Sequence, residues 1–148
     1  MQEKPMAIWK RDFTLESLNL GSTNTLVAHL GICYSEVGDD YLCATMPVGP
    51  QTHQPLGMLH GGASVVLAET LGSVAGNLCV DRAHCCVGLE INANHVRAKR
   101  DGVVTGTTRP LHLGATTQLW QIEIHDERQR LICTSRITLA ILKKKPTE

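Results

Sequence analysis

The apolar positions of residues 63–78 repeat with the period of a helix. At about 100° per residue, four of them fall on one stripe: Leu67, Leu71, Val74 and Leu78. No proline interrupts this segment, whereas Pro55 and Gly57 break the chain before it. The pattern predicts one long helix over residues 63–78 with a glycine-rich start.

Six other segments are rich in β-branched or alternating residues, a pattern typical of strands. They span residues 32–37, 41–46, 85–96, 102–113, 116–125 and 130–142. The turn Gly38-Asp39-Asp40 predicts that the first two form a hairpin. Two short helices are expected between residues 14 and 30, because Thr14 is a good N-cap and Gly31 a good helix end.

One long helix among about six antiparallel strands predicts an α+β fold, in which a curved sheet wraps the apolar stripe. Of the 148 residues, 43% are hydrophobic, and no repeat or linker divides them. A single domain over residues 1–148 is therefore expected. Residues 143–148, which begin with three lysines, are expected to form a disordered tail.

Charge and cysteine content exclude several classes of protein. Fourteen basic residues balance fourteen acidic ones, so the electrostatic argument for nucleic-acid binding is absent. The six cysteines contain no C-x-x-C pair and are interpreted as reduced. With neither a signal-peptide core nor a segment of about 18 apolar residues, the chain is expected to be cytoplasmic.

Motifs for several other chemistries are missing from the sequence. The histidines show no metal-ligand spacing, so no metal is expected. The absence of G-x-S-x-G argues against a serine hydrolase, and the absence of G-x-G-x-x-G and of a P-loop argues against nucleotide chemistry.

Glu69 is the single charged residue of the predicted helix and lies opposite its apolar stripe. Its neighbours on the helix surface are small, and two of them are Gly72 and Gly76. Because an interior glycine costs a helix about 1 kcal/mol relative to alanine, these glycines predict a close approach by a ligand or a second subunit. The alternative is that Glu69 is an ordinary solvated residue.

The sequence His60-Gly61-Gly62 marks the start of the helix as a candidate site. The first amides of a helix have no internal acceptor and lie at the positive end of its dipole. Gly61 and Gly62 can therefore present N–H groups to an anion or a polarised carbonyl, as in an oxyanion hole. The alternative is a turn with a loose cap, but Gln54 just upstream favours a functional site.

The separation of Gly61 and Glu69 predicts a dimer. Their separation of eight positions corresponds to about 12 Å along one helix, so a carbonyl held at Gly61 would not reach Glu69 of the same chain. Two chains with antiparallel helices would bring the two groups together. In addition, a sheet that covers the apolar stripe leaves the Glu69 face to be closed by a second subunit.

Several motifs in order resemble those of the hotdog-fold acyl-CoA thioesterases. They are Gln54-Pro55, Leu59-His60-Gly61-Gly62, Ala68-Glu69-Thr70, Gly72-Ser73, the segment 88–95 (GLEINANH) and the segment 110–114 (PLHLG). The resemblance runs from Ile8 to about Leu142 and is greatest to a bacterial branch. That branch contains the 1,4-dihydroxy-2-naphthoyl-CoA thioesterase of menaquinone synthesis and the proofreading thioesterase of enterobactin synthesis. The resemblance implies a hotdog fold, a homodimer with shared sites that pairs into a homotetramer, and no cofactor apart from the CoA of the substrate.

The resemblance also implies catalytic roles. Glu69 attacks the thioester carbonyl or activates water, and the sequence leaves both possibilities open. The Gly61 amide, aided by Gln54 and His60, polarises the thioester oxygen. Ser73, one turn after Glu69, orients water; the alternative is that it only packs on the helix surface.

Four further residues are assigned to substrate binding by the resemblance. His95 lies near the acyl group, where it could contact a ring hydroxyl, and Arg97 reaches the CoA phosphates. Gly62 and Gly88 complete this set. A histidine at a strand end can equally be structural.

Two departures from the branch limit the substrate assignment. Residues 115–117 are Ala-Thr-Thr where the branch often carries Ser or Arg residues, so contacts to the CoA nucleotide stay open. Leu56 stands where the branch tends to have Phe, which indicates a pocket of different size.

Three functions remain in competition. The first is hydrolysis of an acyl-CoA with an aromatic acyl group, such as the 1,4-dihydroxy-2-naphthoyl or hydroxybenzoyl type. The second is proofreading of aryl groups misloaded on a carrier protein, and the third is non-catalytic acyl-CoA binding. A regulator would need a basic DNA-reading element, which the sequence lacks. The Asp/His pair of hotdog dehydratases is not apparent either.

Overall fold

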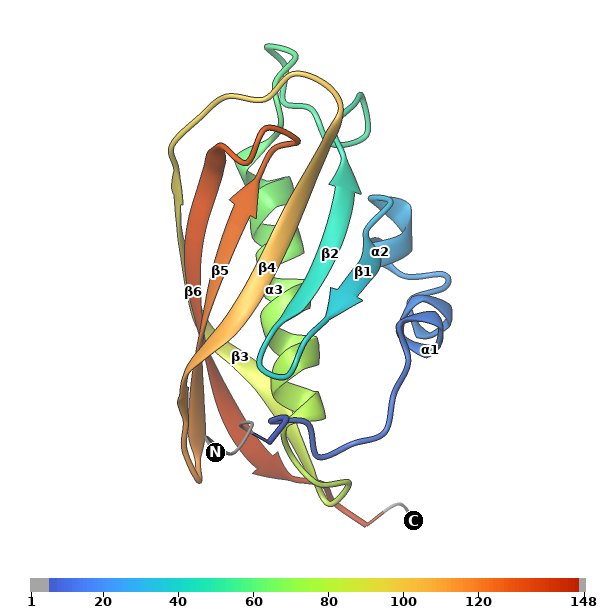
Figure 1. The fold of residues 1–148 in the computed structure, drawn as a ribbon, viewed down its shortest axis with the longest axis vertical. Helices are drawn as coiled ribbons and strands as arrows, with labels where there is room; N and C mark the ends of the chain where they lie inside the picture. The colour runs from blue at the N-terminus through green and yellow to red at the C-terminus, as the bar shows by residue number, and fades with distance from the viewer. Residues whose placement is uncertain (1–5, 147–148) are drawn as a thin grey trace, which may run out of the picture.

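The computed structural model describes residues 6–146 and has one long helix packed on a six-stranded sheet (Figure 1). The helix is α3 (Gly61–Leu78). The strands are β1 (Cys33–Val37), β2 (Leu42–Pro47), β3 (His84–His95), β4 (Val103–Leu113), β5 (Thr117–His125) and β6 (Leu131–Lys143). The α+β prediction is confirmed, and each strand ends within one residue of its expected limit.

The order of the strands in the sheet is β1-β2-β4-β5-β6-β3, with antiparallel pairing throughout. β3 follows α3 in the chain but pairs with the last strand, from His84↔Lys143 to His95↔Cys133. It therefore forms one edge of the sheet. This position carries the end of β3 to the start of α3, where residues of both elements meet.

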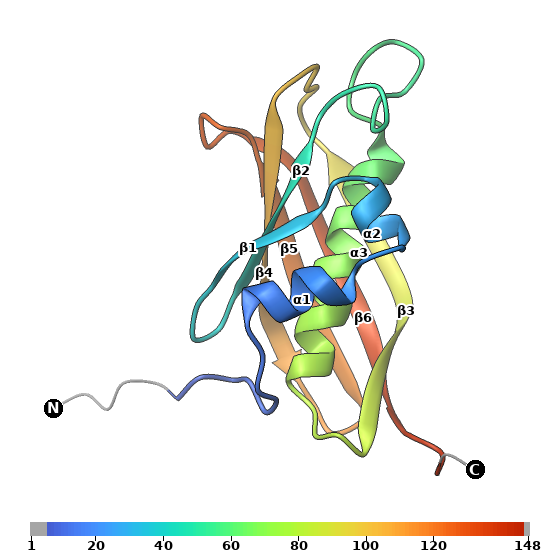
Figure 2. The same cartoon turned by 90° about the vertical axis from the view of Figure 1, so that its right-hand side faces the viewer.

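Two short helices precede the sheet, as expected. They are α1 (Leu15–Gly21) and α2 (Leu26–His29), and Figure 2 shows both on the same side of the sheet as α3. The Thr14 hydroxyl accepts a 3.0 Å hydrogen bond from the Ser17 amide, and the Ser17 hydroxyl accepts one of 3.0 Å from the Thr14 amide. This reciprocal cap fixes the start of α1.

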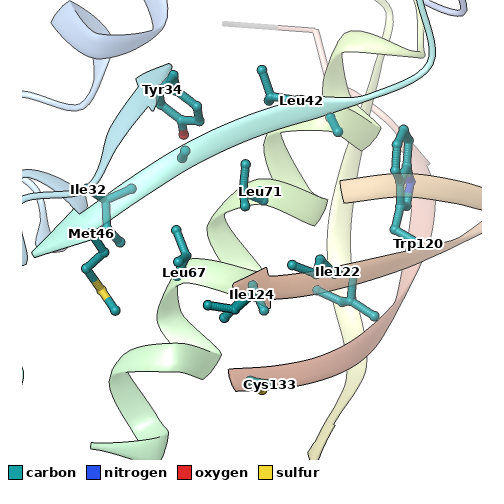
Figure 3. Packing of buried hydrophobic residues seen from close by; sticks show 14 of the residues in the cluster. Ile32, Tyr34, Leu42, Met46, Leu67, Leu71, Trp120, Ile122, Ile124 and Cys133 are labelled. Carbon is teal, nitrogen blue, oxygen red and sulfur yellow. The ribbon is translucent and has the colours of Figure 1, made fainter. Parts of the chain in front are cut away.

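The core lies between α3 and the sheet. Leu67 and Leu71 of α3 are fully buried, and Figure 3 shows them beside Ile122 and Ile124 of β5. No helix within residues 6–146 is long and apolar enough to span a membrane. Of the tail expected to be disordered, residues 147–148 lie outside the described residues. Residue 143 instead ends β6, and the Lys144 amide donates a 2.8 Å hydrogen bond to the Ala83 carbonyl.

The expectation that a ligand or a second subunit approaches Gly72 and Gly76 is wrong. A Cβ atom on Gly72 would lie 2.4 Å from Ile137 Cγ2, and one on Gly76 would lie 2.3 Å from Leu139 Cδ1. Strand β6 of the same chain therefore makes the close approach. The buried face of α3 is wider than the leucine stripe and also contains alanines and glycines, so Glu69 lies at the edge of this face.

Candidate active site

The start of α3 is capped by His60. The His60 ring accepts a 2.8 Å hydrogen bond at Nδ1 from the Gly62 amide, so this amide is engaged within the chain. In contrast, the Gly61 amide has no hydrogen-bond acceptor within residues 6–146. Gly61 is therefore the residue that offers an N–H group at the positive end of the helix.

Four of the expected site residues line one cleft of about 350 Å³: Gln54, Gly61, His95 and Arg97. The His95 ring lies against Gly61, because a Cβ atom on Gly61 would be only 2.8 Å from His95 Nε2. The other walls are largely apolar and come from Met58, Leu59, Val96, Ala98 and Ile132. Residues from a loop, a helix start and a strand end thus meet at the free amide.

The side chain of Gln54 is oriented by its own loop. Its Oε1 accepts a hydrogen bond from the Leu56 amide, so its Nε2 group is left to donate. The Gln54 carbonyl accepts a 3.0 Å hydrogen bond from the Gly57 amide, which closes a tight turn, and Gly57 has a φ of +77°. Glycine adopts this left-handed conformation at little cost.

The loop between β3 and β4 is held in place beside the cleft by a backbone hydrogen bond and an ion pair. The Lys99 carbonyl accepts a 2.7 Å hydrogen bond from the Leu59 amide, and Lys99 Nζ forms a 2.6 Å ion pair with Glu127 Oε2. Glu127 Oε1 also accepts a 2.7 Å hydrogen bond from the Val103 amide. The hydrogen bond from Lys99, followed by that from Val103, lowers the pKa of Glu127 to about 2.

Glu69 does not line this cleft. It is half-buried on α3, and its carboxylate lies over Gly88 of β3, where a Cβ atom would be 2.6 Å from Glu69 Oε1. β3 has a register shift between Gly88 and Glu90. Ser73 follows Glu69 by one turn and is also half-buried. Its carbonyl accepts a 2.8 Å hydrogen bond from Asn77.

The structure therefore separates the expected site residues into two groups. One group surrounds the Gly61 amide, and the other consists of Glu69, Ser73 and Gly88. Because α3 is a continuous helix from Gly61 to Leu78, the two groups are about 12 Å apart along its axis. No group of three or more His, Cys, Asp or Glu side chains in the described chain is arranged to hold a metal ion.

One polar side chain of the cleft was missed by the sequence analysis. Ser64 lines the cleft and is 2% exposed. It stands between Ala63 and Val65 in a segment recognised by its apolar period, in which a single serine gives no signal. Its spacing of three residues from Gly61 could have indicated it, because residues three apart share a helix face.

The sequence that forms these elements matches a known family. Residues 56–133 match the model of the Thioesterase superfamily. The chain belongs to this superfamily. It is a thioester hydrolase, as the resemblance implied.

Two relatives match nearly the whole chain. The 1,4-dihydroxy-2-naphthoyl-CoA hydrolase of Escherichia coli is 59% identical over 135 residues, which cover 91% of this chain and 99% of that protein. The proofreading thioesterase EntH of Cronobacter sakazakii is 58% identical over 135 residues, which cover 91% of this chain and 98% of that protein. The expected branch of the superfamily is therefore confirmed.

The fold is shared with a solved thioesterase. The crystal structure of a Haemophilus influenzae thioesterase superposes with a TM-score of 0.91 at 51% sequence identity. The match covers 92% of this chain and 95% of that chain. The hotdog fold implied by the resemblance is thereby confirmed.

Proposed function

We propose that this thioesterase hydrolyses aromatic acyl-CoA thioesters of the 1,4-dihydroxy-2-naphthoyl or hydroxybenzoyl type. The observation that carries the proposal is the Gly61 amide, which has no acceptor among the described residues and belongs to a residue that lines a cleft with Gln54 and His95. The name of the Escherichia coli relative supports the choice of substrate. The apolar residues of the cleft wall suit an aromatic acyl group, and the polar side chains beside them could orient it.

The oxygen of the thioester is held at the start of α3 in this proposal. The Gly61 amide and Gln54 Nε2 donate hydrogen bonds to it, and the positive end of the helix dipole stabilises the negative charge that develops there. Glu69 either attacks the carbonyl carbon, forming a mixed anhydride that water hydrolyses after CoA has left, or removes a proton from a water that attacks the carbonyl directly. The C–S bond then breaks, and CoA leaves as a thiolate that needs little acid help. The products are a carboxylic acid and free CoA.

A homodimer is part of the same proposal, because Glu69 and Gly61 of one chain are too far apart. Within the described chain, β3 pairs on one side only, with β6. It exposes apolar side chains, with Val87 43% and Leu89 62% exposed. Such an edge favours pairing with another strand. Antiparallel pairing of two β3 strands would place Glu69 of one subunit toward Gly61 of the other, and pairs of dimers would give the homotetramer expected from the resemblance.

Replacement of the proposed base tests this function. Glu69→Gln is expected to fold normally and to lose about a hundredfold or more in kcat, because a positioned base or nucleophile is removed. Release of CoA from a panel of aromatic and aliphatic acyl-CoAs would be followed with a thiol reagent. Glu16→Gln, a change at an exposed glutamate of α1, is the matched control. Equal turnover by Glu69→Gln and the wild-type protein would refute the assignment.

Proofreading of a carrier protein is the second candidate. It is supported by the 58% identity with the proofreading thioesterase EntH. The two functions would be separated by comparing kcat/KM for the same aroyl group on CoA and on an aryl carrier protein. A higher value for the carrier-bound group would favour proofreading, and a higher value for the CoA ester would favour the primary proposal.

A further inference from the structure

Ser64 is buried, and its hydroxyl has no hydrogen-bond partner in the part of the chain that the structure describes. The residue is 2% exposed and lines the cleft that contains Gln54, Gly61 and His95. Within residues 6–146, no hydrogen bond involves its hydroxyl. In the same residues, every fully enclosed side-chain N or O atom has a partner. Ser64 Oγ must therefore reach solvent, and the space that Ser64 lines is the cleft.

Other serines of the chain show that a serine hydroxyl in this fold can find a hydrogen-bond acceptor. A serine in or at the end of a helix commonly donates to the carbonyl four residues earlier, as Ser22, the C-cap of α1, does to the Leu18 carbonyl at 3.1 Å. Ser135 is also 2% exposed, but its hydroxyl donates a 2.7 Å hydrogen bond to the Asn92 carbonyl. For Ser64 the corresponding acceptor would be the His60 carbonyl, which instead accepts from the amides of residues 63 and 64.

The position of Ser64 places its hydroxyl near the acyl part of a bound thioester. It lies three residues after Gly61, which is about 4.5 Å along the helix, on the same face. A thioester oxygen held at Gly61 would leave the acyl group to occupy the cleft between Ser64, His95 and the apolar wall. A polar atom on that acyl group could then form hydrogen bonds with the side chains of Ser64 and His95.

We propose that Ser64 determines specificity: its hydroxyl, together with the His95 ring, hydrogen-bonds a hydroxyl substituent on the acyl group. The proposal rests on the proposed thioesterase function and names a selectivity within it. An acyl group without such a substituent would shield the Ser64 hydroxyl from water without giving it a hydrogen-bond partner. This cost would make the enzyme discriminate against thioesters whose acyl group lacks the hydroxyl.

The test compares substrates that differ by one hydroxyl. Wild-type protein, Ser64→Ala and the control Ser135→Ala would be assayed with benzoyl-CoA and with its three monohydroxy isomers. We expect the wild-type preference for the best hydroxybenzoyl isomer over benzoyl-CoA to fall by about tenfold in Ser64→Ala, chiefly through KM. Ser135→Ala is expected to keep the wild-type preference.

Thermal unfolding separates specificity from a structural role. Ser135→Ala removes a satisfied hydrogen bond and is expected to lower Tm. Ser64→Ala removes a hydroxyl with no partner and is expected to leave Tm unchanged or higher. An unchanged substrate preference in Ser64→Ala, or a fall in its Tm equal to that of Ser135→Ala, would overturn the proposal.

Binding measurements keep the two proposals distinguishable. If the wild-type protein cleaves none of the thioesters, the proposed function fails. The dissociation constants of the same thioesters, measured by calorimetry, then still test Ser64. The ratio of the constants for benzoyl-CoA and the preferred hydroxybenzoyl-CoA should fall by the same factor in Ser64→Ala, and an unchanged ratio would refute its role.

Discussion

At the scale of single residues, the position of the Glu69 carboxylate depends on Gly88, the glycine of β3 over which it lies. Glycine weakens a strand, so its presence in β3 needs a reason. Any side chain at Gly88 would meet the Glu69 carboxylate, since a Cβ atom there would be 2.6 Å from Oε1. The resemblance assigned Gly88 to substrate binding. The structure adds that Gly88 leaves room for the carboxylate.

Gly88→Ala is therefore expected to displace the Glu69 carboxylate without unfolding the protein. Because misplacement of a catalytic group by about 1 Å can cost up to a hundredfold in rate, kcat should fall by about tenfold to a hundredfold. Steady-state kinetics would measure the fall, and circular dichroism would check the fold. Gly21→Ala, where an added Cβ atom would have no neighbour within 4 Å, is the matched control. A kcat equal to that of Gly21→Ala would show that Gly88 does not position Glu69.

The sequence pointed to most of the residues around the Gly61 amide, Gln54 and Gly61 by their local pattern and His95 and Arg97 through motifs shared with the thioesterases. Gln54, Gly61, His95 and Arg97 were all expected at the site, and the structure gathers them in one cleft. Ser64 was missed because two structural properties mark it: it is buried, and its hydroxyl has no hydrogen-bond partner among the described residues. Neither property can be read from its neighbours in the chain.

At the scale of elements, the turn between β5 and β6 holds two carboxylates with low pKa values. Burial of Asp126 raises its pKa. Hydrogen bonds from the Arg130 amide and guanidinium and from the Arg128 amide outweigh this effect and bring the pKa down to about 2. Glu127 also has a pKa of about 2, and its ion pair with Lys99 fixes the loop that carries Arg97. This turn therefore supports one wall of the cleft.

Acid is expected to weaken this turn. The folded-state pKa of Asp126 lies below its ordinary value of 3.8, so its charge stabilises the fold above that value. This contribution is lost as the pH falls from about 4 to about 2. Asp126→Asn should have a lower Tm than the wild-type protein at pH 7, and the difference should shrink toward pH 2. A difference in Tm that stays constant across this range would contradict the assignment.

The limits of the elements could be predicted from sequence, but their mutual packing could not. Strand limits follow from alternation and from turn residues such as Gly38, which act locally. The buried face of α3 was misjudged because Gly72 and Gly76 were counted as part of an open face, whereas Ile137 and Leu139 pack against them. The pairing of β3 with β6 joins distant parts of the chain, and no local pattern specifies it.

At the scale of the whole molecule, the proposed parts of the thioesterase site lie too far apart to act together within one subunit. The Gly61 amide and the Glu69 carboxylate lie on one continuous helix, two turns apart. Pairing through the exposed edge of β3 would let each subunit complete the site of the other. The central claim is therefore that each active site takes Glu69 from one subunit and Gln54 and Gly61 from its partner.

Mixed dimers test this claim most directly. Glu69→Gln and Gln54→Ala would each be expected to lose about a hundredfold in kcat. The two variants would be co-expressed with different affinity tags, and assemblies that carry both tags would be purified. If the sites are shared, each dimer that pairs the two variants has one site with both changes and one intact site, so the activity should rise far above that of either parent variant, up to about half that of the wild-type protein. Activity that stays at the level of the two parent variants would contradict the shared site, because every site would then lack one of the two residues.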